Sequence, residues 1–313
     1  MKIPYIKTEF VIEPIDELHL PYFKGSTFRG VFGNAFKKVV CALKMQECEN
    51  CLLKSNCIYA YIFETPPIVQ TPILNMDKYK AVPHPFILEP PLHNGRLYKK
   101  GEEIKFYLII IGRAINYFPY FVYTFERCGE LGMGKGRGKF ILKRVQDDSG
   151  ILYDHNSKSI KCPTKNILEI NEHIELKEDT QSIESITINI LTPIRIKHER
   201  KLISILNFHV LIKSLMLRLN LLHYFHCEER ELTWSHKDII EKAKKVTIKE
   251  SKIKWFDWSR YSSRQDTKMK LGGIMGRITY EGNIKPYMEI LKAGEMFHVG
   301  KNTSFGLGKY EIL

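Results

Sequence analysis

The sequence has no long apolar run. Among its 313 residues, no stretch approaches the roughly 18 apolar residues that a membrane-spanning helix needs. The best apolar stretch, residues 106–111, is typical of a buried strand, and the N-terminal residues lack the apolar segment of a secretion signal. We therefore expect a cytoplasmic protein with no membrane partner.

Acidic residues are scarce beside basic ones. The chain has 35 Asp and Glu against 48 Lys and Arg, which gives a formal net charge of +13. This excess indicates a polyanionic partner, and an aromatic content of 12% would support base stacking. The alternative is a lysine-rich proteome in the source organism.

The common nucleotide-binding patterns are also missing, although glycine and lysine gather near the C-terminus. In residues 300–308, Lys301 is followed by Asn302, and only five residues follow Gly308. No helix can begin there, whereas both the P-loop and the dinucleotide fingerprint require one. Glycine lets the backbone approach a phosphate chain closely and lysine supplies charge, so a loop that leads into a short terminal strand favours RNA.

Four of the seven cysteines lie close together, as Cys41, Cys48, Cys51 and Cys57. In a reducing compartment such a cluster indicates metal ligation rather than disulfides. Four thiolates make a closed structural zinc site, with an iron–sulfur cluster as the alternative. A site with four sulfur ligands leaves no position for water, so no catalytic metal is expected.

The sequence predicts two similar series of strands and helices, each with a glycine-rich loop before its last strand. The first series is predicted to have strands at 6–12, 103–112 and 140–145, helices at 26–43 (capped by Ser26 or Thr27) and 115–128, and a glycine run at 132–138. The second is predicted to have strands at 184–197, 276–280 and 309–313, helices at 201–225 and 285–291, and the glycine loop at 300–308. These elements predict an α+β fold of two tandem ferredoxin-like, βαββαβ domains, at 1–175 with the cysteine insertion and at 184–313, joined by a linker at 172–185.

The signature of RNA-recognition modules is absent, although the predicted fold is theirs. Arg137 and Gly138 open such a motif, but the stacking aromatics do not follow. We therefore expect RNA contacts from loops and grooves rather than from a sheet surface. The basic segment 242–254 runs into Trp255 and Trp258, which suits single-stranded RNA; buried tryptophans are the alternative, and the one we favour.

Several motifs resemble one known family. The segment from His298 through Lys301 to Gly308 closely resembles the C-terminal glycine loop of the CRISPR-associated endoribonucleases that process precursor CRISPR RNA, within the RAMP superfamily. The similarity extends to Thr192-Pro-x-Arg195-Ile-Lys197, Trp258-Ser-Arg260-Tyr261, Leu271-Gly-Gly-x-x-Gly276, Gly25-Ser-x-x-Arg29-Gly30 and the glycine run at 132–138. It thus covers most of the chain.

The resemblance implies tandem ferredoxin-like domains that bind repeat RNA in a basic groove. It also implies metal-independent cleavage, in which a ribose 2′-OH attacks the adjacent phosphate and leaves a 2′,3′-cyclic phosphate and a 5′-OH. CRISPR repeat RNA, mature guide RNA and other CRISPR effector or adaptation subunits are the implied partners.

Family members usually carry a catalytic histidine on or near the first helix, with a tyrosine and a lysine. No histidine lies between Gly25 and Cys57 in this chain. The resemblance therefore leaves two histidines as candidates for proton transfer, with the tyrosine and lysine that follow the first of them: His19, Tyr22, Lys24 and His298. The structural alternatives are a solvated loop for His19, a core aromatic for Tyr22 and a strand histidine for His298, while His84, between two prolines, is expected to shape a turn.

The candidate RNA-binding residues are cations and hydroxyls of the two glycine loops and the family motifs: Arg29, Lys135, Arg137, Lys139, Lys197, Arg260, Lys301, Thr303, Ser304 and Lys309. For Arg29 the alternative is a carboxylate partner.

The sequence leaves three functions open. The first is a CRISPR RNA-processing endoribonuclease. The second is a RAMP subunit that holds guide RNA without cutting it, which the missing first-helix histidine favours. The third is a redox or zinc enzyme built on the four cysteines.

Overall fold

The computed structural model describes residues 1–43, 47–66, 82–171, 184–198, 201–228, 236–257, 259–262 and 267–313, without the side chains of 236, 259–262 and 267–270. The chain divides into two compact units. The N-terminal unit contains Ile3–Ile167 and a short segment that begins at Tyr224, and the C-terminal unit contains Met1–Lys2, Leu168–His223 and the segment that ends at Leu313. Apart from its last two residues, the predicted linker at 172–185 lies outside the described residues.

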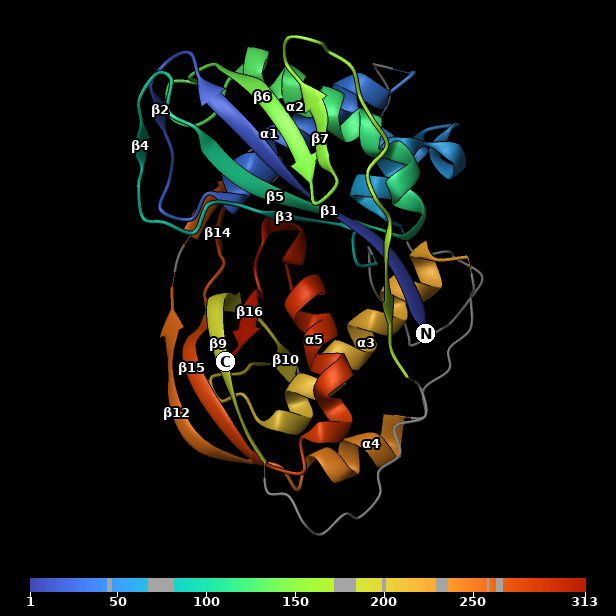
Figure 1. Cartoon of the computed structure of the whole chain (residues 1–313), viewed down its shortest axis with the longest axis vertical. Helices are drawn as coiled ribbons and strands as arrows, with labels where there is room; N and C mark the ends of the chain where they lie inside the picture. Colours follow the sequence, from blue (N-terminus) through green and yellow to red (C-terminus); the bar gives the residue numbers. More distant parts are fainter. Residues whose placement is uncertain are drawn as a thin grey trace. The chain divides into compact units, whose positions relative to one another are not determined.

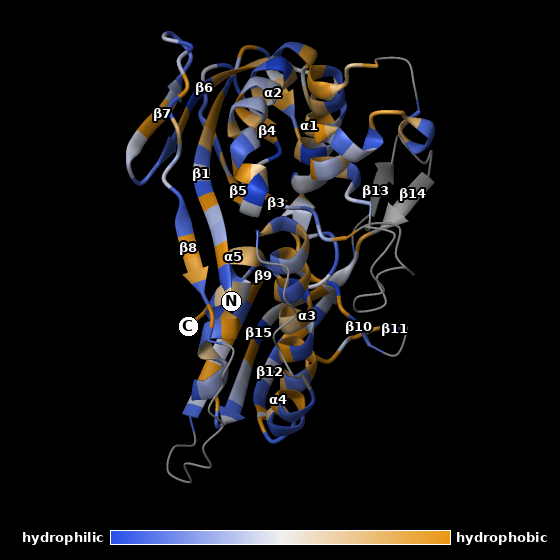
Figure 2. Ribbon diagram, turned by 90° about the vertical axis from the view of Figure 1, so that its right-hand side faces the viewer, coloured by the Kyte–Doolittle hydropathy of each residue, from blue (hydrophilic) through white to orange (hydrophobic). Residues whose placement is uncertain are grey.

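An antiparallel sheet frames the N-terminal unit, with the strand order β3-β5-β1-β6-β7 (Figure 1). Its strands are β1 (Lys2–Pro14), β3 (Phe86–Glu89), β5 (Ile104–Ile111), β6 (Phe140–Asp147) and β7 (Gly150–Asp154), and β8 (Asn166–Glu169) follows. Buried and more exposed residues alternate along most of β1, whose ribbon changes between the hydrophobic and hydrophilic colours of Figure 2. One face of the sheet is therefore buried and the other is open to solvent.

Two helices, α1 (Gly25–Val40) and α2 (Phe118–Leu131), cover the buried face of this sheet (Figure 1). The ring centroid of Phe32 lies 5.3 Å from that of Phe121 and 5.1 Å from that of Phe125, so an aromatic cluster joins the helices. The apolar spacing predicted this helix face, and the burial of four of its residues confirms it: Phe28, Phe32, Ala35 and Phe36.

Short elements fill the connections on either side of α1 and after β5. A two-stranded ribbon pairs β2 (Leu18–His19) with β4 (Leu97–Tyr98). The cysteine segment contains two 3-10 turns, η1 (Cys48–Asn50) and η2 (Lys54–Asn56), followed by the π-helix η3 (Ala60–Glu64). A further 3-10 turn, η5 (Gly112–Tyr117), precedes α2.

The C-terminal unit has a second antiparallel sheet, in the order β12-β15-β9-β16. Helices α3 and α5 lie on one face of it (Figure 1). Its larger elements are β9 (Glu184–Ile194), α3 (Phe208–His226), α4 (His236–Ala243), β12 (Thr247–Phe256), β15 (Gly273–Gly282), α5 (Met288–Phe297) and β16 (Tyr310–Ile312). Its smaller elements are β10 (Lys197–His198), β11 (Lys201–Leu202), β13 (Ser259–Ser262), β14 (Thr267–Lys270) and the 3-10 turns η6 (Lys285–Tyr287) and η7 (Thr303–Phe305).

The two units share one chain order and one strand order. The series is β1-α1-β3-β5-α2-β6 in the first and β9-α3-β12-β15-α5-β16 in the second. In both sheets the second, third, first and fourth strands of the series lie side by side in that order. The fold is thus a mixed α/β arrangement on antiparallel sheets.

Three expectations about local structure are wrong. Neither Ser26 nor Thr27 caps α1, because the helix begins one residue earlier and its N-cap is Lys24. Helix α3 starts at Phe208 rather than at 201, since residues 201–202 pair with 197–198 as a ribbon. Trp255 is 41% exposed on β12, the edge strand of the sheet that the described residues form, whereas we favoured burial; Trp258 lies outside the described residues.

None of the helices in the described parts of the chain is both long and apolar enough to span a membrane.

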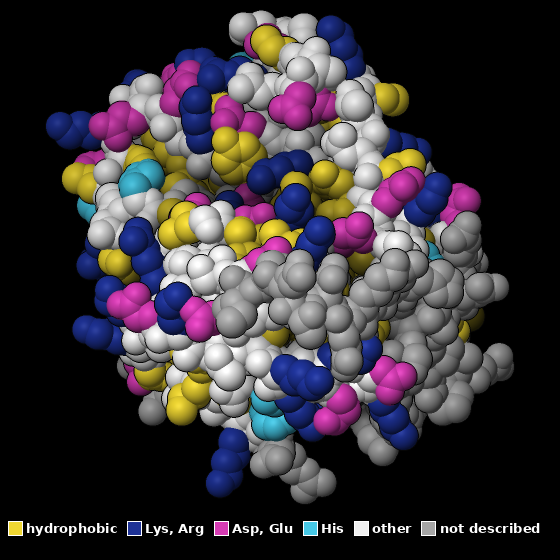
Figure 3. Space-filling model, turned by 60° about the horizontal axis from the view of Figure 1, so that its bottom comes forward, with side chains coloured by type: hydrophobic (Ala, Val, Ile, Leu, Met, Phe, Trp, Pro, Cys, Tyr) yellow, Lys and Arg dark blue, Asp and Glu magenta, His cyan; other side chains and the backbone are white. Residues whose placement is uncertain are grey.

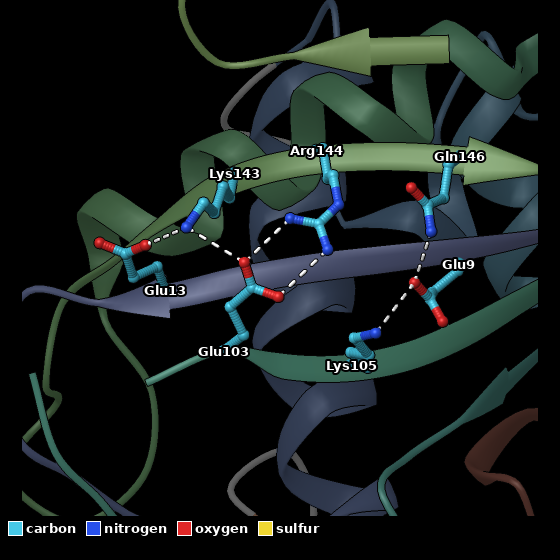
Figure 4. Close-up of polar contacts among 7 residues, drawn as sticks. All are labelled: Glu9, Glu13, Glu103, Lys105, Lys143, Arg144 and Gln146. Carbon is cyan, nitrogen blue, oxygen red and sulfur yellow. Dashed lines mark hydrogen bonds and ion pairs between the residues drawn. The ribbon is translucent and has the colours of Figure 1, made fainter. Parts of the chain in front are cut away.

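Ion pairs cover the open face of the N-terminal sheet (Figure 4). Glu103 accepts two hydrogen bonds from Arg144, at 2.9 and 3.1 Å, and its carboxylate lies 3.1 Å from the Lys143 ammonium. Hydrogen bonds from Arg144 and then Lys143 lower the pKa of Glu103 to about 2. Lys143 also bonds Glu13 at 2.7 Å, and Glu9 accepts a hydrogen bond from the side chain of Gln146. This face therefore presents mainly paired charges, together with the exposed aromatic ring of Tyr107, whose hydroxyl donates to Glu9 at 2.9 Å.

Replacing Glu103 by Gln removes the charge that Arg144 and Lys143 share, and we expect a loss of about 1 kcal/mol in the free energy of unfolding at pH 7. The folded carboxyl has a lowered pKa, so its stabilisation is complete above the unfolded pKa of about 4.3 and disappears as the pH falls through about 2. Urea denaturation at pH 7 and pH 3 measures the difference. Glu47→Gln, at an exposed site in the cysteine loop, is the control, and identical midpoints for the two variants at pH 7 would contradict the prediction.

Candidate nucleic-acid interface

The first glycine loop (residues 132–138) is a tight turn that only glycine permits at several positions. Gly132, Gly134 and Gly136 have φ values of 73, 76 and 82°. The loop returns on itself through a bridge between Met133 and Gly138. The predicted phosphate-binding side chains of this region are all exposed: Lys135, Arg137 and Lys139.

A backbone hydrogen bond holds this loop against strand β2. The N–H of Lys135 donates to the carbonyl of His19 at 2.9 Å. A Cβ on Gly134 would lie 2.3 Å from the same carbonyl oxygen, so the approach requires glycine. The side chain of His19 is 55% exposed, with Nε2 4.0 Å from a carboxylate oxygen of Glu17. The structure thus brings two predicted site residues, His19 and Lys135, together.

Lys24, a predicted catalytic residue, is fully buried at the start of α1. Its ammonium donates to the carbonyls of His93 at 2.8 Å and Tyr22 at 3.4 Å. Burial, and then the charge of Arg96, lowers the pKa of Lys24. The side chain of Tyr22 is 50% exposed, so the alternative that it is a core aromatic is wrong.

Three residues near this site were missed in the sequence. The carbonyl of Arg96 accepts the N–H of Leu20 at 2.7 Å, and the hydroxyl of Tyr98 lies 3.3 Å from Nε2 of His93. Burial and the charge of Glu102 raise the pKa of Tyr98 to about 12, so its hydroxyl keeps its proton at neutral pH. No sequence pattern marks these residues, because the strand that places them, β4, has only two residues.

Arg29 contacts a histidine and an aromatic ring. Its Nη2 lies 3.0 Å from Nε2 of His84, and the guanidinium lies 4.2 Å from the ring centroid of Phe63. These contacts leave both alternatives for Arg29, an RNA phosphate and a carboxylate partner, as predictions.

The C-terminal glycine loop (residues 300–308) repeats the arrangement of the first. Lys301 donates its N–H to the carbonyl of Arg195 at 2.9 Å. Gly300 has a φ of 84°, and a Cβ there would lie 2.6 Å from that carbonyl oxygen. In each unit, therefore, a left-handed glycine and the N–H of the following lysine meet the carbonyl of a residue near a strand end. We call this contact the lysine clamp.

Further bonds close the C-terminal loop onto the end of β9. The hydroxyl of Thr192 donates to the carbonyl of Gly306 at 2.8 Å and accepts the N–H of Lys309 at 2.8 Å. Thr303 and Ser304 are buried in this loop, so their hydroxyls are enclosed by protein instead of lying ready for RNA. Lys309 is half-buried.

His298, the second predicted catalytic histidine, has no exposed surface. It ends α5 with a φ of 60°, and its Nδ1 lies 3.0 Å from the carbonyl of Leu307. It is not the strand histidine of the structural alternative. Its enclosure favours a packing role beneath the loop over proton exchange with RNA.

Three cations lie together at the C-terminal clamp. Burial, followed by the charges of Lys197 and Arg195, lowers the pKa of Lys301. The pKa of Arg195 is also lowered by burial, an effect that the charge of Asp257 opposes. Mutual repulsion of this kind is relieved when an anion binds. Arg195 belongs to a motif that resembles the family, but the sequence did not mark it as an RNA-binding residue. The predicted Arg260 lies on β13, where side chains are not described.

One face of the molecule carries Lys and Arg side chains spread among acidic and apolar ones (Figure 3). The positive charge on this face does not form one continuous patch.

The four cysteines have the right chemistry for zinc, but their arrangement does not fit it. Within the described ranges, which contain all four, no group of three or more potential ligands is placed to hold a metal ion. Cys48 and Cys57 pack against the hydrophobic cluster of the N-terminal unit instead, and all four are free thiols. The structure does not support the zinc site, which stays a prediction.

Comparison with known proteins gives two family matches. The family model AF_1859_N, an N-terminal domain, matches residues 3–165, and the model of the CRISPR-associated endoribonuclease Cas6 matches residues 188–310. An uncharacterized protein of Archaeoglobus fulgidus is 22% identical over 311 residues, which cover 95% of this chain and 93% of that protein.

Solved structures of Cas6 share the fold at low sequence identity. A Cas6 product complex has a TM-score of 0.55 at 15% identity, over 98% of this chain and 100% of the other. Thermus thermophilus Cas6 has a TM-score of 0.51 at 13% identity, over 100% and 99%. A chain of a partial Cas6-RT-Cas1–Cas2 complex has a TM-score of 0.55 at 16% identity, over 99% of this chain and 46% of that one.

Residues 188–310 thus match the family model of the CRISPR-associated endoribonuclease Cas6, and the fold is that of solved Cas6 structures. With a family model that covers more than half of its length, at residues 3–165, the chain belongs to the AF_1859_N family.

Proposed function

We propose that this protein binds CRISPR repeat RNA and cleaves precursor CRISPR RNA as an endoribonuclease. The observation that carries the proposal is the lysine clamp, which recurs in both units and places an exposed lysine on a rigid glycine loop. Glycine backbone lets a phosphate chain approach closely, and the lysine side chain on the same loop supplies the positive charge. The match to the Cas6 family model supports RNA processing as the activity.

We further propose that the two units are tandem ferredoxin-like domains, bounded near 1–175 and 184–313. The shared strand order of the two sheets supports this assignment, because it is the order of the βαββαβ fold. Contacts to RNA would then come from the loops, since ion pairs occupy the open face of the N-terminal sheet.

The proposed reaction is attack by a ribose 2′-oxygen on the adjacent phosphorus. The O2′–P bond forms as the P–O5′ bond breaks, one group takes the 2′-OH proton, and the 5′-oxygen receives a proton as it leaves. Cations stabilise the crowded phosphorane, so the reaction needs no catalytic metal.

Among the predicted residues, His19 is the histidine whose ring solvent reaches, so we assign it to proton transfer. The exposed Tyr22 is close to it in sequence, while the buried Lys24 supports the site by holding the segment of His93. The enclosed His298 supports the C-terminal loop. Phosphate binding is assigned to the predicted cations Arg29, Lys135, Arg137, Lys139, Lys197, Arg260, Lys301 and Lys309, together with Arg195.

The alternative is a RAMP subunit that holds guide RNA without cutting it. Two observations favour this alternative: no histidine lies between Gly25 and Cys57, and His298 is enclosed. Either function would suit other CRISPR effector or adaptation subunits as partners. A structural neighbour, the Cas6-RT-Cas1–Cas2 complex, shows a Cas6 in such an assembly.

The first test is cleavage of end-labelled repeat RNA in excess EDTA. We expect discrete products that end in a 2′,3′-cyclic phosphate, and no cleavage when every ribose is replaced by 2′-deoxyribose, because the attacking oxygen is then missing. His19→Ala should slow cleavage by about 100-fold or more without a matching loss of binding. Tight binding with no cleavage by the wild type would favour the guide-holding alternative, and neither activity would refute both functions.

The second test separates the effect of losing the clamp from the effect of straining the backbone of the glycine loop. Gly134→Ala and Gly136→Ala both place a side chain at a φ near 80°, at a cost of about 1–2 kcal/mol each. Only Gly134→Ala also drives a Cβ into the carbonyl of His19, whereas Gly136 has open space around it. Electrophoretic mobility shifts with repeat RNA should show weaker binding for Gly134→Ala than for Gly136→Ala. Equal affinities would show that the clamp does not matter to RNA.

The third test concerns the C-terminal cations. Lys197→Ala and Lys301→Ala should each weaken RNA binding and reduce the slope of log K against log salt concentration by about 0.7, the value for one lost contact with a single strand. Fluorescence anisotropy at several salt concentrations measures both quantities. Lys292→Ala removes an exposed lysine of α5 and should leave the slope unchanged; a change equal to that of Lys301→Ala would point to net charge rather than to a site.

A further inference from the structure

The Leu271-Gly272-Gly273 segment lies where a two-stranded ribbon leaves the C-terminal sheet. Strand β14 ends at Lys270 and β15 begins at Gly273, so the segment joins the two strands. On the sheet side Phe256 pairs with Gly273, and on the ribbon side Ser259 pairs with Lys270. The segment is therefore the base of the β13–β14 ribbon, and the proposed function assigns no role to it.

The side chain of Arg195, just after the end of β9, crosses this base. Its Nη1 donates a hydrogen bond to the carbonyl of Gly272. A Cβ on Gly273 would lie 3.0 Å from Cγ of Arg195 and 2.5 Å from the carbonyl oxygen of Ile194, so the path of the side chain requires glycine there. Neither Gly272 nor Gly273 has a left-handed φ, so these glycines provide space rather than an unusual backbone conformation.

The C-terminal glycine loop fixes the backbone of Arg195 at the same time. Its carbonyl accepts the N–H of Lys301 in the lysine clamp, at 2.9 Å, and Arg195 pairs with Gly300 in a β-bridge. One residue thus holds two segments that are distant in the sequence, the loop through its main chain and the base of the ribbon through its guanidinium. A change of the Arg195 side chain can therefore release the ribbon and leave the clamp intact.

The carboxylate of Asp257 lies against the same base. A Cβ on Gly272 would come within 2.3 Å of its Oδ1, so Gly272 leaves room for the carboxylate as Gly273 does for the arginine. The charge of Asp257 opposes the effect of burial on the pKa of Arg195. Opposite charges therefore approach each other at the point where the ribbon begins.

Fold stability alone does not account for an arginine at this position. Among the described residues, Nε of Arg195 is buried and has no hydrogen-bond partner. A buried donor that lacks an acceptor destabilises the folded state, because it has lost its hydrogen bonds to water. Such a group in a native structure calls for an explanation other than stability, and here the explanation is the contact with the ribbon.

The ribbon that begins at this base needs an anchor. In the part of the chain that the structure describes, β13 and β14 pair only with each other. A two-stranded ribbon without further partners is only marginally stable in water. Strand β13 contains Arg260, one of the predicted RNA-binding residues. An anchor at the base determines how well this segment is ordered before RNA binds.

We propose that Arg195 is a positioning residue that joins the C-terminal glycine loop to the base of the β13–β14 ribbon, so that Lys301 and Arg260 act on one RNA strand. The proposal rests on the proposed function and adds to it the device that holds two of its RNA-contacting segments together. This role is separate from the charge of Arg195. Ordering the ribbon in the free protein spares that entropic cost on binding.

Amide hydrogen exchange of the whole chain, free of RNA, tests the positioning directly. Arg195→Met keeps the aliphatic stem beside Gly273 but removes the bond to Gly272, so the amides of β14 should exchange about tenfold faster. Arg195→Lys retains the charge and a donor, and it should stay near the wild type. Arg277→Met removes an exposed arginine from β15 and is the matched control, which should leave exchange in β14 unchanged.

A double-mutant cycle on repeat-RNA affinity, measured by fluorescence anisotropy, tests the consequence for binding. Arg260→Ala should weaken binding about fivefold in the wild-type background. In the Arg195→Met background it should weaken binding by less than about twofold, because the ribbon is no longer held. Lys135→Ala changes the glycine loop of the other unit, and it should weaken binding by the same factor in both backgrounds.

The outcomes separate the positioning from the function on which it rests. If Arg195→Met does not change exchange in β14, or if β14 is already unprotected in the wild type, the positioning is wrong even when repeat RNA is bound and cleaved. An Arg260→Ala effect of equal size in both backgrounds, or no effect in either, would overturn it as well. A wild type that binds no repeat RNA would refute the proposed function and the RNA contact of the ribbon together, whatever the exchange shows.

Discussion

A backbone hydrogen bond between a glycine-loop lysine and a carbonyl near a strand end is the constraint that organises both candidate RNA contacts. It joins Lys135 to His19 in one unit and Lys301 to Arg195 in the other, at 2.9 Å each time. The bond leaves no room for a Cβ on the preceding glycine, whose left-handed φ turns the chain at that point. Each loop is thereby rigid while its lysine side chain remains exposed, and this combination makes the loops suitable for a phosphate chain.

The charges of the protein fall into two kinds. On the open face of the N-terminal sheet, Glu103 pairs with Arg144 and Lys143, so the charges largely cancel. At the C-terminal clamp, burial and the charges of Lys197 and Arg195 lower the pKa of Lys301, while Asp257 offsets part of the burial effect on the pKa of Arg195. The positive charge there is therefore less fully paired, which favours binding of an anion. A net charge of +13 alone does not distinguish these regions. Only the neighbours of each cation show which ones are available to RNA.

Sequence patterns predicted the large elements well and the site only in part. The apolar spacing of α1 and the glycine runs are local signals, so the helix face and both loops could be read directly. Tyr98 and His93 could not, because a two-residue strand pairing across about 80 residues has no periodic signature. The burial of His298, Thr303 and Ser304 was missed for a related reason. When a motif resembles that of a family, the sequence alone does not show which of its side chains are buried. The cysteine spacing predicted a metal site, yet Cys48 and Cys57 serve as apolar side chains against the core.

The clamp has the same geometry in the two units but a different residue at its carbonyl end. In the N-terminal unit that residue is histidine, whose side chain is an imidazole, and in the C-terminal unit it is arginine, whose side chain is a guanidinium. Because the bond uses only backbone atoms, it is indifferent to this side chain. The side chain at this position can therefore differ between the two units without disturbing the loop, so one loop geometry presents an imidazole in one unit and a guanidinium in the other.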